Sequence, residues 1–370
     1  MRLLICAGGT GGGVYPAMAV KYALGNDAAS VLWVGGQGGL EAGLVSRAGV
    51  PFTTIPAAGL HGVGIRALPR NLWALLKGTL KARRIVREFR PDVLLLTGGY
   101  VGAPMAVAAR NIPMLLYVPD IEPGLAIKFL SRFATVIAAT AEETRAFFSG
   151  RTRFEVTGYP TRPELTAWER SSARGKLGLN DALPVLLVFG GSKGAHSLNQ
   201  AVLEDLGRLL DVCQLVHISG EFDWPDVEQA RQALSPEIQE RYHPVAYLHE
   251  DMGAALASAD LVVSRAGAST LGEFPLFGLP AVLVPYPYAW RYQKVNADFL
   301  VQHGAAVILE DQNLRTGLFL SVTDLLASPE RLEAMRAAMR SLARPDAAAH
   351  LASLLSDLTR SKSSAGETTW

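Results

Sequence analysis

Three clusters of glycine, each directly after an apolar run, are the residues best suited to do chemistry in this chain. They are Gly8–Gly13, Gly98–Gly102 and Gly190–Gly194. Where a strand turns into a helix, glycine lets the backbone approach a ligand closely, and free N–H groups and the helix dipole point at that ligand. Such glycines can also do no more than make a tight turn. Because the clusters occupy three equivalent places, we predict that they bind a diphosphate.

The first cluster does not fit the fingerprint of a dinucleotide-binding turn. That fingerprint is G-x-G-x-x-G, with an acidic residue at the end of the second strand. Here Gly9 and Gly11 are followed by Val14 where the third glycine belongs. The second strand ends in Gly35 and Gly36 without an acid. The pattern therefore argues against NAD as a ligand.

A further segment, Ser264–Glu273, follows an apolar run and opens a predicted helix. The N–H groups near Ala268, Ser269 and Thr270 would lie at the positive end of the helix dipole. Glu273 stands three residues after Thr270, which is the capping-box spacing, so its carboxylate can bond the backbone at the helix start. Alternatively, a carboxylate one turn into the helix can accept hydrogen bonds from two ribose hydroxyls. The sequence leaves both interpretations open.

The segment Leu68–Arg90 has the composition of a basic amphipathic helix. Leucines and a tryptophan alternate with lysines and arginines, and Glu88 is its only acid. A helix of this kind suits an anionic membrane surface. The alternative is a core helix with a solvated basic face.

The bulk composition indicates a globular chain of two domains. With 370 residues, the chain exceeds the size at which single cores stop growing. A composition of 49% hydrophobic and 19% charged residues excludes a disordered or fibrous chain and favours buried parallel sheet. The histidines are scattered without metal-ligand spacing, so we predict no metal and no other cofactor. A net charge of +1 gives no argument for a nucleic-acid partner, and none is predicted.

Cysteine usage and hydropathy indicate the compartment. Cys6 and Cys213 lie far apart in apolar runs, which argues against a disulfide framework and favours the reducing cytoplasm. The apolar run at the N-terminus is too short for a signal peptide, and no window approaches the ~20 apolar residues that span a bilayer. We therefore predict a cytoplasmic protein that meets a membrane only from its surface.

Apolar strands that end in glycine and open into helices alternate along the chain, which is typical of a doubly wound α/β fold. The predicted strands are Arg2–Ala7, Asp92–Thr97, Pro113–Tyr117, Pro184–Phe189, Gln214–Ser219, Leu261–Arg265 and Ala281–Pro285. Gly278 is predicted to cap the end of a helix. The third glycine cluster nearly repeats the first, as if a second α/β unit began there.

The segment Thr157–Pro163 carries two prolines and a glycine, and we interpret it as the connector between domains. The predicted domains are residues 1–162 and 163–345. A C-terminal helix over 346–361 is predicted to pack back on the first domain. Residues 362–370 are rich in serine and threonine and are predicted to be disordered.

Taken together, the motifs resemble the MurG-like family of two-domain inverting glycosyltransferases. The resemblance extends from Gly8 to about Leu354. Each motif alone is weak, and their combination is specific. The segments that carry it are Gly8–Gly12, Thr97–Tyr100, Gly158–Arg162, Gly190–Ala195 with Asn199, Ser264–Ala268 with Glu273, and Gln293. The resemblance implies the GT-B fold, in which two Rossmann-like doubly wound domains face each other across a cleft.

The resemblance also implies a role for single residues. In the second domain, Arg162 and Ser192 would contact the donor diphosphate, Leu248 the uracil through its backbone, Glu273 the ribose and Gln293 the sugar. The remaining donor-binding residues would be Asn199, Ala268, Ser269 and Thr270. In the first domain, the acceptor diphosphate would be held by Thr10, Gly11, Gly12, Gly98, Gly99 and Tyr100. Such enzymes need no metal, because a helix N-terminus stabilises the leaving UDP.

Two positions depart from the family pattern. The first glycine loop of the family ends in a histidine, proposed as base or acceptor contact, where this chain has Gly13. The loop after the strand that ends at Tyr117 reads His-Glu-Gln-Asn in the family, whereas here it carries Asp120 and Glu122. Ligands lie beyond the carboxyl ends of strands, so either acid is on the correct side to be the catalytic base. The alternative is that both are solvated loop carboxylates.

The resemblance implies transfer of N-acetylglucosamine from UDP-N-acetylglucosamine to undecaprenyl-diphospho-N-acetylmuramoyl-pentapeptide, the step from lipid I to lipid II in peptidoglycan synthesis. The lipid acceptor favours the membrane interpretation of Leu68–Arg90, and a peripheral location on the inner face of the plasma membrane. The altered loops leave open a related transferase with another lipid or small-molecule acceptor. Gly13 leaves open a nucleotide-sugar binder without catalysis, and an epimerase would share the fold and the UDP site.

Overall fold

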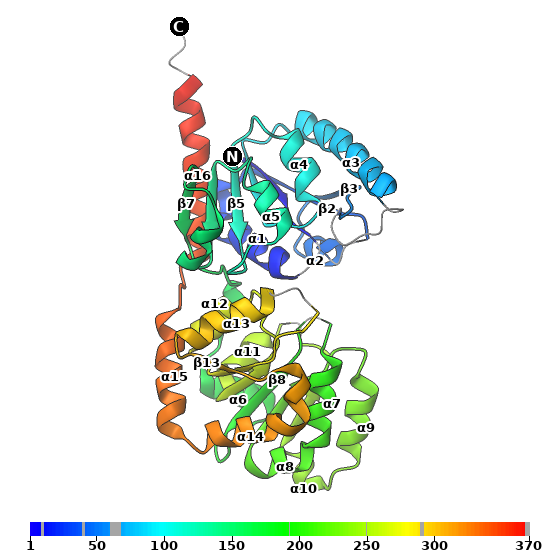
Figure 1. Ribbon diagram of the computed structural model, residues 1–370, viewed down its shortest axis with the longest axis vertical. Coiled ribbons are helices and arrows are strands. Elements are labelled where there is room, and N and C mark those ends of the chain that lie inside the picture. Colours follow the sequence, from blue (N-terminus) through cyan, green and yellow to red (C-terminus); the bar gives the residue numbers. More distant parts are fainter. Residues whose placement is uncertain are drawn as a thin grey trace. The chain divides into compact units, whose positions relative to one another are not determined.

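The computed structural model describes residues 1–8, 11–38, 41–59, 68–191, 193–248, 250–288 and 292–366. Two compact units make up the chain, and Figure 1 shows each as a sheet covered by helices. The first unit consists of Met1–Thr161 and Pro345–Trp370, and the second of Arg162–Arg344. Each sheet is parallel throughout the described residues, so the predicted doubly wound α/β fold is confirmed.

The sheet of the first unit has the strand order β3-β2-β1-β4-β5-β6-β7. Its strands are β1 (Arg2–Cys6), β2 (Ser30–Gly36), β3 (Phe52–Ile55), β4 (Val93–Leu96), β5 (Met114–Val118), β6 (Val136–Ala139) and β7 (Arg153–Val156). The strands β4 and β5 are buried at every residue, as parallel strands covered on both faces require. The glycine clusters after β1 and β4 therefore leave neighbouring strands at the same edge of the sheet.

Helices on both faces and the C-terminal helix complete the first unit. They are α1 (Gly11–Leu24), α2 (Glu41–Arg47), α3 (Leu68–Phe89), α4 (Gly102–Ala108), α5 (Leu125–Leu130) and α16 (Ala347–Gly366), with short 3₁₀ turns at Gly25–Asp27 and Glu142–Phe147. Helix α16 packs against α1 and buries Leu351 and Leu355. It continues to Gly366, whereas the sequence predicted disorder from residue 362; residues 367–370 lie outside the described residues.

The sheet of the second unit has the order β10-β9-β8-β11-β12-β13. Its strands are β8 (Val185–Phe189), β9 (Gln214–Ile218), β10 (Tyr242–Val245), β11 (Leu261–Ser264), β12 (Ala281–Leu283) and β13 (Ala306–Ile308). Its helices are α6 (Arg170–Leu177), α7 (His196–Glu204), α8 (Leu206–Val212), α9 (Trp224–Gln232), α10 (Pro236–Gln239), α11 (Met252–Ser258), α12 (Thr270–Phe277), α13 (Tyr292–Gln302), α14 (Leu314–Leu326) and α15 (Pro329–Ser341), with 3₁₀ turns η4 (Pro163–Ala167) and η5 (Asp311–Asn313).

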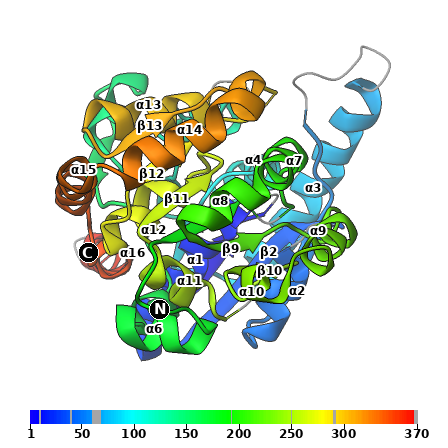
Figure 2. The same cartoon turned by 90° about the horizontal axis from the view of Figure 1, so that it is seen from below.

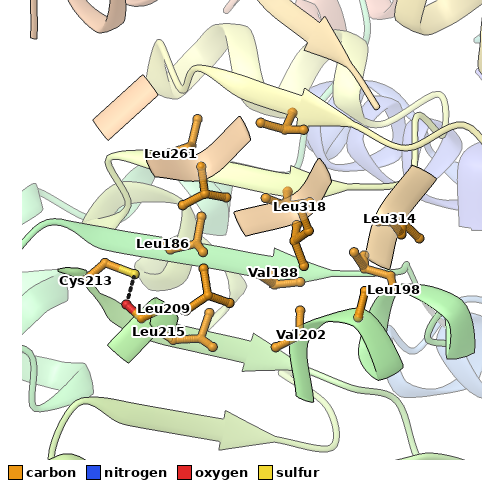
Figure 3. Packing of buried hydrophobic residues seen from close by; sticks show 14 of the residues in the cluster. Leu186, Val188, Leu198, Val202, Leu209, Cys213, Leu215, Leu261, Leu314 and Leu318 are labelled. Carbon is orange, nitrogen blue, oxygen red and sulfur yellow. Dashed lines mark hydrogen bonds between the residues drawn. The ribbon is translucent and has the colours of Figure 1, made fainter. Parts of the chain in front are cut away.

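One face of this sheet packs on helices that carry leucine at helical spacing. Leu186 and Val188 of β8 lie against Leu198 of α7 and Leu318 of α14, as Figure 3 shows. Gly278 ends α12 in the left-handed conformation, with its N–H donating to the carbonyls of Phe274 and Pro275, so the predicted C-cap is confirmed. This packing fixes the carboxyl ends of β8 and β11, where the second set of candidate site residues lies.

Both sheets reverse their strand order at one place. In the first unit this switch point lies between β1 and β4, and in the second between β8 and β11. Ligands of open α/β sheets bind at such points, beyond the carboxyl ends of the strands. The glycine clusters at 8–13, 98–102 and 190–194 and the segment 264–273 all follow these four strands.

Candidate functional site

In the first unit, two glycine turns lie against one buried carboxylate, and a third packs on one of those turns. The backbone N–H of Gly36 donates to Oε1 of Glu41 at 2.8 Å, and Glu41 is almost fully buried. A Cβ on Gly8 would collide with the same oxygen, and one on Gly99 would lie 2.7 Å from the carbonyl oxygen of Gly8. Gly99 also has a φ of 79°, so two separate reasons restrict it to glycine. Glu41 was not predicted from the sequence, because the dinucleotide fingerprint places its acid at the end of the second strand and not at the start of the next helix.

The predicted acceptor loops meet at Gly13 and Thr97. A Cβ on Gly13 would lie 3.2 Å from Oγ1 of Thr97, so a side chain at residue 13 has little room there. Oγ1 of Thr97 is buried and has no hydrogen-bond partner among the described residues. Gly11 and Gly12 begin α1, and Gly98, Gly99 and Tyr100 follow Thr97 directly, whereas Thr10 lies outside the described residues.

The loop that carries the two candidate bases is anchored at its start. The Thr140 hydroxyl donates to the carbonyl of Pro119 at 2.8 Å and lies 2.8 Å from the hydroxyl of Tyr117. Burial raises the pKa of Tyr117 well above its ordinary value, the hydrogen bond with Thr140 lowers it, and the charge of Asp120 raises it further. Asp120 therefore follows a fixed strand end.

The two acids differ in their surroundings. Asp120 is partly exposed, whereas Glu122 is buried, with its carboxylate 3.8 Å from the ammonium of Lys128. A base must reach the proton that it accepts. Asp120 is therefore the more accessible of the two acids, whereas Glu122 lies beside Lys128 of α5. Which of them is the base stays a prediction.

In the second unit, the glycine loop after β8 turns sharply into α7. The N–H of Gly194 donates to the carbonyl of Gly191 at 3.0 Å, and Gly194 has a φ of 75°. A Cβ on Gly194 would collide with the carbonyl oxygen of Ser219, so the loops after β8 and β9 touch backbone to backbone. Ser192, the predicted diphosphate contact in this loop, lies outside the described residues.

Asn199, a predicted donor-binding residue, has its side chain wholly buried. Its Nδ2 donates to the carbonyl of Ser219 and to Asp223, both at 2.7 Å. Its Oδ1 accepts from Nε2 of His217 at 3.0 Å, which leaves Nδ1 of that ring to accept from the hydroxyl of Tyr242. Burial lowers the pKa of His217 to about 4, consistent with this neutral tautomer. Asn199 therefore holds the loop after β9 in place, and its contact with the donor stays a prediction.

The segment after β11 bears on the two interpretations of Glu273. The hydroxyl of Thr270 donates to the carbonyl of Gly267 at 2.7 Å, and no side-chain hydrogen bond caps α12. Glu273 is buried, and burial raises its pKa to about 7, against the lowering effects of Arg162 and of a hydrogen bond with Ser269. The start of α12 thus shows no capping box, and the ribose contact of this buried carboxylate stays a prediction.

The other predicted donor residues follow strands β10, β11 and β12. Leu248 lies half-buried between β10 and α11, and Ala268 is buried just before α12. Oε1 of Gln293 accepts from the backbone N–H of Tyr286 at 2.8 Å. Within the described ranges, no group of three or more His, Cys, Asp or Glu side chains could hold a metal ion.

Helix α3, which covers Leu68–Phe89, exposes its large apolar side chains. These are Leu72, Trp73, Leu76 and Leu80, each at least half exposed. Ala82 and Ile85 are buried, and the ammonium of Lys77 lies 5.2 Å from the ring centroid of Trp73. Both views place α3 at the rim of its unit (Figures 1 and 2). The helix therefore packs on its unit through one face and leaves these leucines exposed, which a helix wholly in the core would not do. No helix among the described residues is long and apolar enough to cross a bilayer.

Comparison with known proteins identifies a family for each half of the chain. Residues 3–139 match the glycosyltransferase family 28 N-terminal domain, and residues 185–351 match the glycosyltransferase family 28 C-terminal domain. A relative from Roseiflexus sp. (strain RS-1) is 40% identical, over 97% of this chain and 95% of its own. One from Chlorobaculum tepidum is 38% identical, over 98% of this chain and 100% of its own. Both are named UDP-N-acetylglucosamine–N-acetylmuramyl-(pentapeptide) pyrophosphoryl-undecaprenol N-acetylglucosamine transferase.

Solved structures agree on the fold. The crystal structure of MurG from Acinetobacter baumannii is similar with a TM-score of 0.75 and 29% identity, and covers 96% of this chain and 99% of that one. A UDP-GlcNAc 2-epimerase from Neisseria meningitidis reaches a TM-score of 0.67 over 96% of this chain and 100% of its own. At 14% identity that second likeness shows the fold alone, so it gives no support to an epimerase activity.

Proposed function

The chain belongs to glycosyltransferase family 28, and from that membership we propose that it moves N-acetylglucosamine from UDP-N-acetylglucosamine to undecaprenyl-diphospho-N-acetylmuramoyl-pentapeptide. Relatives that carry this activity in their names align over nearly its whole length. The observation on the molecule that carries the proposal is Glu273, a buried carboxylate beside Arg162 at the switch point of the second unit. That pair suits a ribose next to a diphosphate.

Each donor residue then has a chemical task. Glu273 accepts hydrogen bonds from the ribose hydroxyls, and Arg162 balances negative charge on the diphosphate. The backbone N–H groups of Ala268 and Ser269, just before α12, stabilise the same charge as it grows on the departing UDP. Gln293 binds the hydroxyls of the donor sugar. Ser192 completes the diphosphate contacts in this proposal.

The transfer is a direct displacement with inversion. The acceptor hydroxyl oxygen forms a bond to the anomeric carbon while the bond from that carbon to the diphosphate oxygen breaks. The electron pair of the broken bond leaves with UDP, and the hydroxyl proton goes to the carboxylate of Asp120, the proposed base. Gly11, Gly12 and the turn at Gly98–Tyr100 hold the acceptor diphosphate through backbone N–H groups.

The proposal is tested by incubating the purified chain with radiolabelled UDP-N-acetylglucosamine and a short-chain lipid-linked muramoyl-pentapeptide. We expect label in the lipid product at equal rates with and without a chelator, since no metal takes part in the proposed mechanism. Saturable UDP binding without transfer would favour another acceptor or a binder without catalysis. Loss of transfer on chelation would overturn the metal-free mechanism alone.

We further propose that α3 is the surface that meets the membrane. Its exposed leucines and Trp73 lie among lysines and arginines, which is the composition of helices that lie in an anionic bilayer interface. The apolar side chains would enter the acyl region while the basic ones meet lipid phosphates. The acceptor carries its diphosphate on such a surface, so this placement brings the enzyme to its substrate.

Charged substitutions on α3 should release the protein from vesicles. Burial of one leucine contributes about 1.5–3 kcal/mol, so Leu76→Glu with Leu80→Glu is expected to weaken binding to anionic vesicles at least about tenfold. Leu320→Glu is the control, because Leu320 is 62% exposed against 57% for Leu80 and lies on α14 of the second unit. Binding is measured by sedimentation with vesicles. If the control lost as much vesicle affinity as the α3 variant, α3 would not be the membrane-binding surface.

A further inference from the structure

We propose that Arg265 and Asp311 are positioning residues for donor-sugar recognition, acting through Tyr286 on Gln293. Neither residue was a candidate from the sequence. The inference rests on the proposed function, in which Gln293 binds the sugar of UDP-N-acetylglucosamine.

Arg265 has its guanidinium bonded entirely within the second unit. It is 8% exposed, and its Nη1 donates to Oδ1 of Asp311 at 2.6 Å and to the carbonyl of Val284 at 3.1 Å. Its Nη2 donates to the hydroxyl of Ser197 at 2.8 Å, and that hydroxyl donates to Oδ1 of Asp311 at 2.8 Å. One side chain therefore joins the ends of β11 and β12, the start of α7 and the turn η5. Such a fork of fixed donors suits a role in support of neighbouring loops.

The same guanidinium holds the loop after β12 at a second point. Its central carbon lies 5.2 Å from the ring centroid of Tyr286, in cation–π contact. Arg265 thus fixes Val284 by its carbonyl and Tyr286 by its ring, on either side of Pro285. Tyr286 is 44% exposed, and its ring packs edge-on against the ring of Tyr288 with 5.6 Å between the two centroids.

Tyr286 in turn fixes the amide of Gln293. Its backbone N–H donates to Oε1 of Gln293 at 2.8 Å, which turns the NH₂ group away from the loop. The amide therefore presents donors, which suit sugar hydroxyl oxygens as acceptors. One turn along α13, Nδ2 of Asn296 donates to the carbonyl of Ala266 at 3.2 Å. Both the loop and the helix that place Gln293 are tied to the turn at 265–266.

These contacts predict a selective defect. Loss of the Asp311–Arg265 pair would free Tyr286 and let the Gln293 amide turn, while the ribose and diphosphate contacts of Glu273 and Arg162 stay in place. Binding of UDP would be preserved, and the extra affinity that the sugar provides would be lost. Discrimination at the sugar hydroxyls would relax for the same reason.

The test is calorimetric titration of the full chain with UDP, UDP-N-acetylglucosamine and its C4 epimer, without acceptor. Asp311→Asn and Arg265→Lys are each expected to weaken binding of UDP-N-acetylglucosamine about tenfold, the effect of roughly one hydrogen bond, with UDP affinity within about twofold. The preference over the C4 epimer should shrink in parallel. Gln293→Ala should give the same selective loss, and the double variant Asp311→Asn with Gln293→Ala should lose no more.

Arg208→Lys is the matched control. Nη1 of Arg208, on α8, lies 2.7 Å from Oδ1 of Asp205, and its guanidinium carbon lies 3.7 Å from the ring centroid of Phe319 on α14. This variant should change no affinity. Equal weakening of UDP and UDP-sugar in the Arg265 and Asp311 variants, or no weakening at all, would overturn the inference. If the Arg265 and Asp311 variants do not fold, Ser197→Ala replaces them. It removes one hydroxyl from the same cluster and should likewise weaken binding of UDP-N-acetylglucosamine while UDP affinity is kept. Absence of transfer by the unmodified chain would count against the proposed function and not against this one.

Discussion

Asp120→Asn is expected to lower kcat by about 10² to 10⁴, the usual contribution of a positioned base. The proton of the acceptor hydroxyl would then have no acceptor at the moment of attack. Because the asparagine keeps the shape of the side chain, KM for both substrates should change little, and kcat and kcat/KM should fall together. Steady-state transfer rates at varied donor and acceptor concentrations measure both quantities.

Two variants make this result specific. Glu122→Gln should lower kcat far less, since Glu122 is buried with Lys128 as its partner. Glu142→Gln is the background control, because Glu142 is an exposed acid of the same unit that pairs with Arg145. If kcat of Asp120→Asn equalled that of the unmodified chain, Asp120 would not be the base. A larger loss of kcat in Glu122→Gln would then identify Glu122 as the base.

Glu273→Gln is expected to weaken UDP binding about 100-fold, because two hydrogen bonds from ribose to a charged acceptor become bonds to a neutral amide. Ribose hydroxyls favour the ionised carboxylate, and burial holds the pKa of Glu273 at about 7 in the ligand-free protein. UDP affinity of the unmodified chain should therefore decline as the pH falls below about 7, by up to about tenfold per unit. The glutamine variant should bind weakly without that dependence, as titration at several pH values would show.

The same carboxyl group makes an opposite prediction for stability. Its folded-state pKa of about 7 lies above the ordinary 4.5, so its contribution to stability is complete below about pH 4.5 and is lost as the pH rises through 7. The whole loss corresponds to roughly 3 kcal/mol. Without ligand, Glu273→Gln should thus be more stable than the unmodified chain near pH 8 and about equal to it near pH 4, because these two pH values lie beyond the ends of that titration. Denaturant unfolding that gave one constant difference at both pH values would contradict the burial of this charge.

The sequence predicted the elements that follow short-range rules. The apolar runs before Gly8, Gly98 and Gly190 are parallel strands, and Gly278 caps α12, because strand burial and left-handed turns depend on a few adjacent residues. The amphipathic character of Leu68–Arg90 also follows a local period. Its exposure needed the structure, since a basic face is compatible with either a solvated or a membrane-bound helix.

The parts of the site that the sequence did not predict depend on distant partners. Arg265 and Asp311 are 46 residues apart in the chain, and their pairing follows from the adjacency of β11, β12 and β13. Asn199 was found from the family motif, but its three hydrogen-bond partners, His217, Ser219 and Asp223, could not be predicted. They lie on and after β9 and use both the donors and the acceptor of the amide. The lack of a capping box at the start of α12 likewise could not be predicted, because the spacing of Thr270 and Glu273 permits that motif and only the structure shows no side-chain cap there.

The return of α16 to the first unit has a consequence for synthesis of the chain. The first unit is built from both ends of the sequence, whereas Arg162–Arg344 is continuous. On the ribosome the second unit has all its residues before the first one does, although the first begins to emerge earlier. Until Leu351 and Leu355 arrive, the side of α1 that they cover stays open to water and to other nascent chains. A chain stopped before residue 345 would keep that surface uncovered and be a natural target for chaperones.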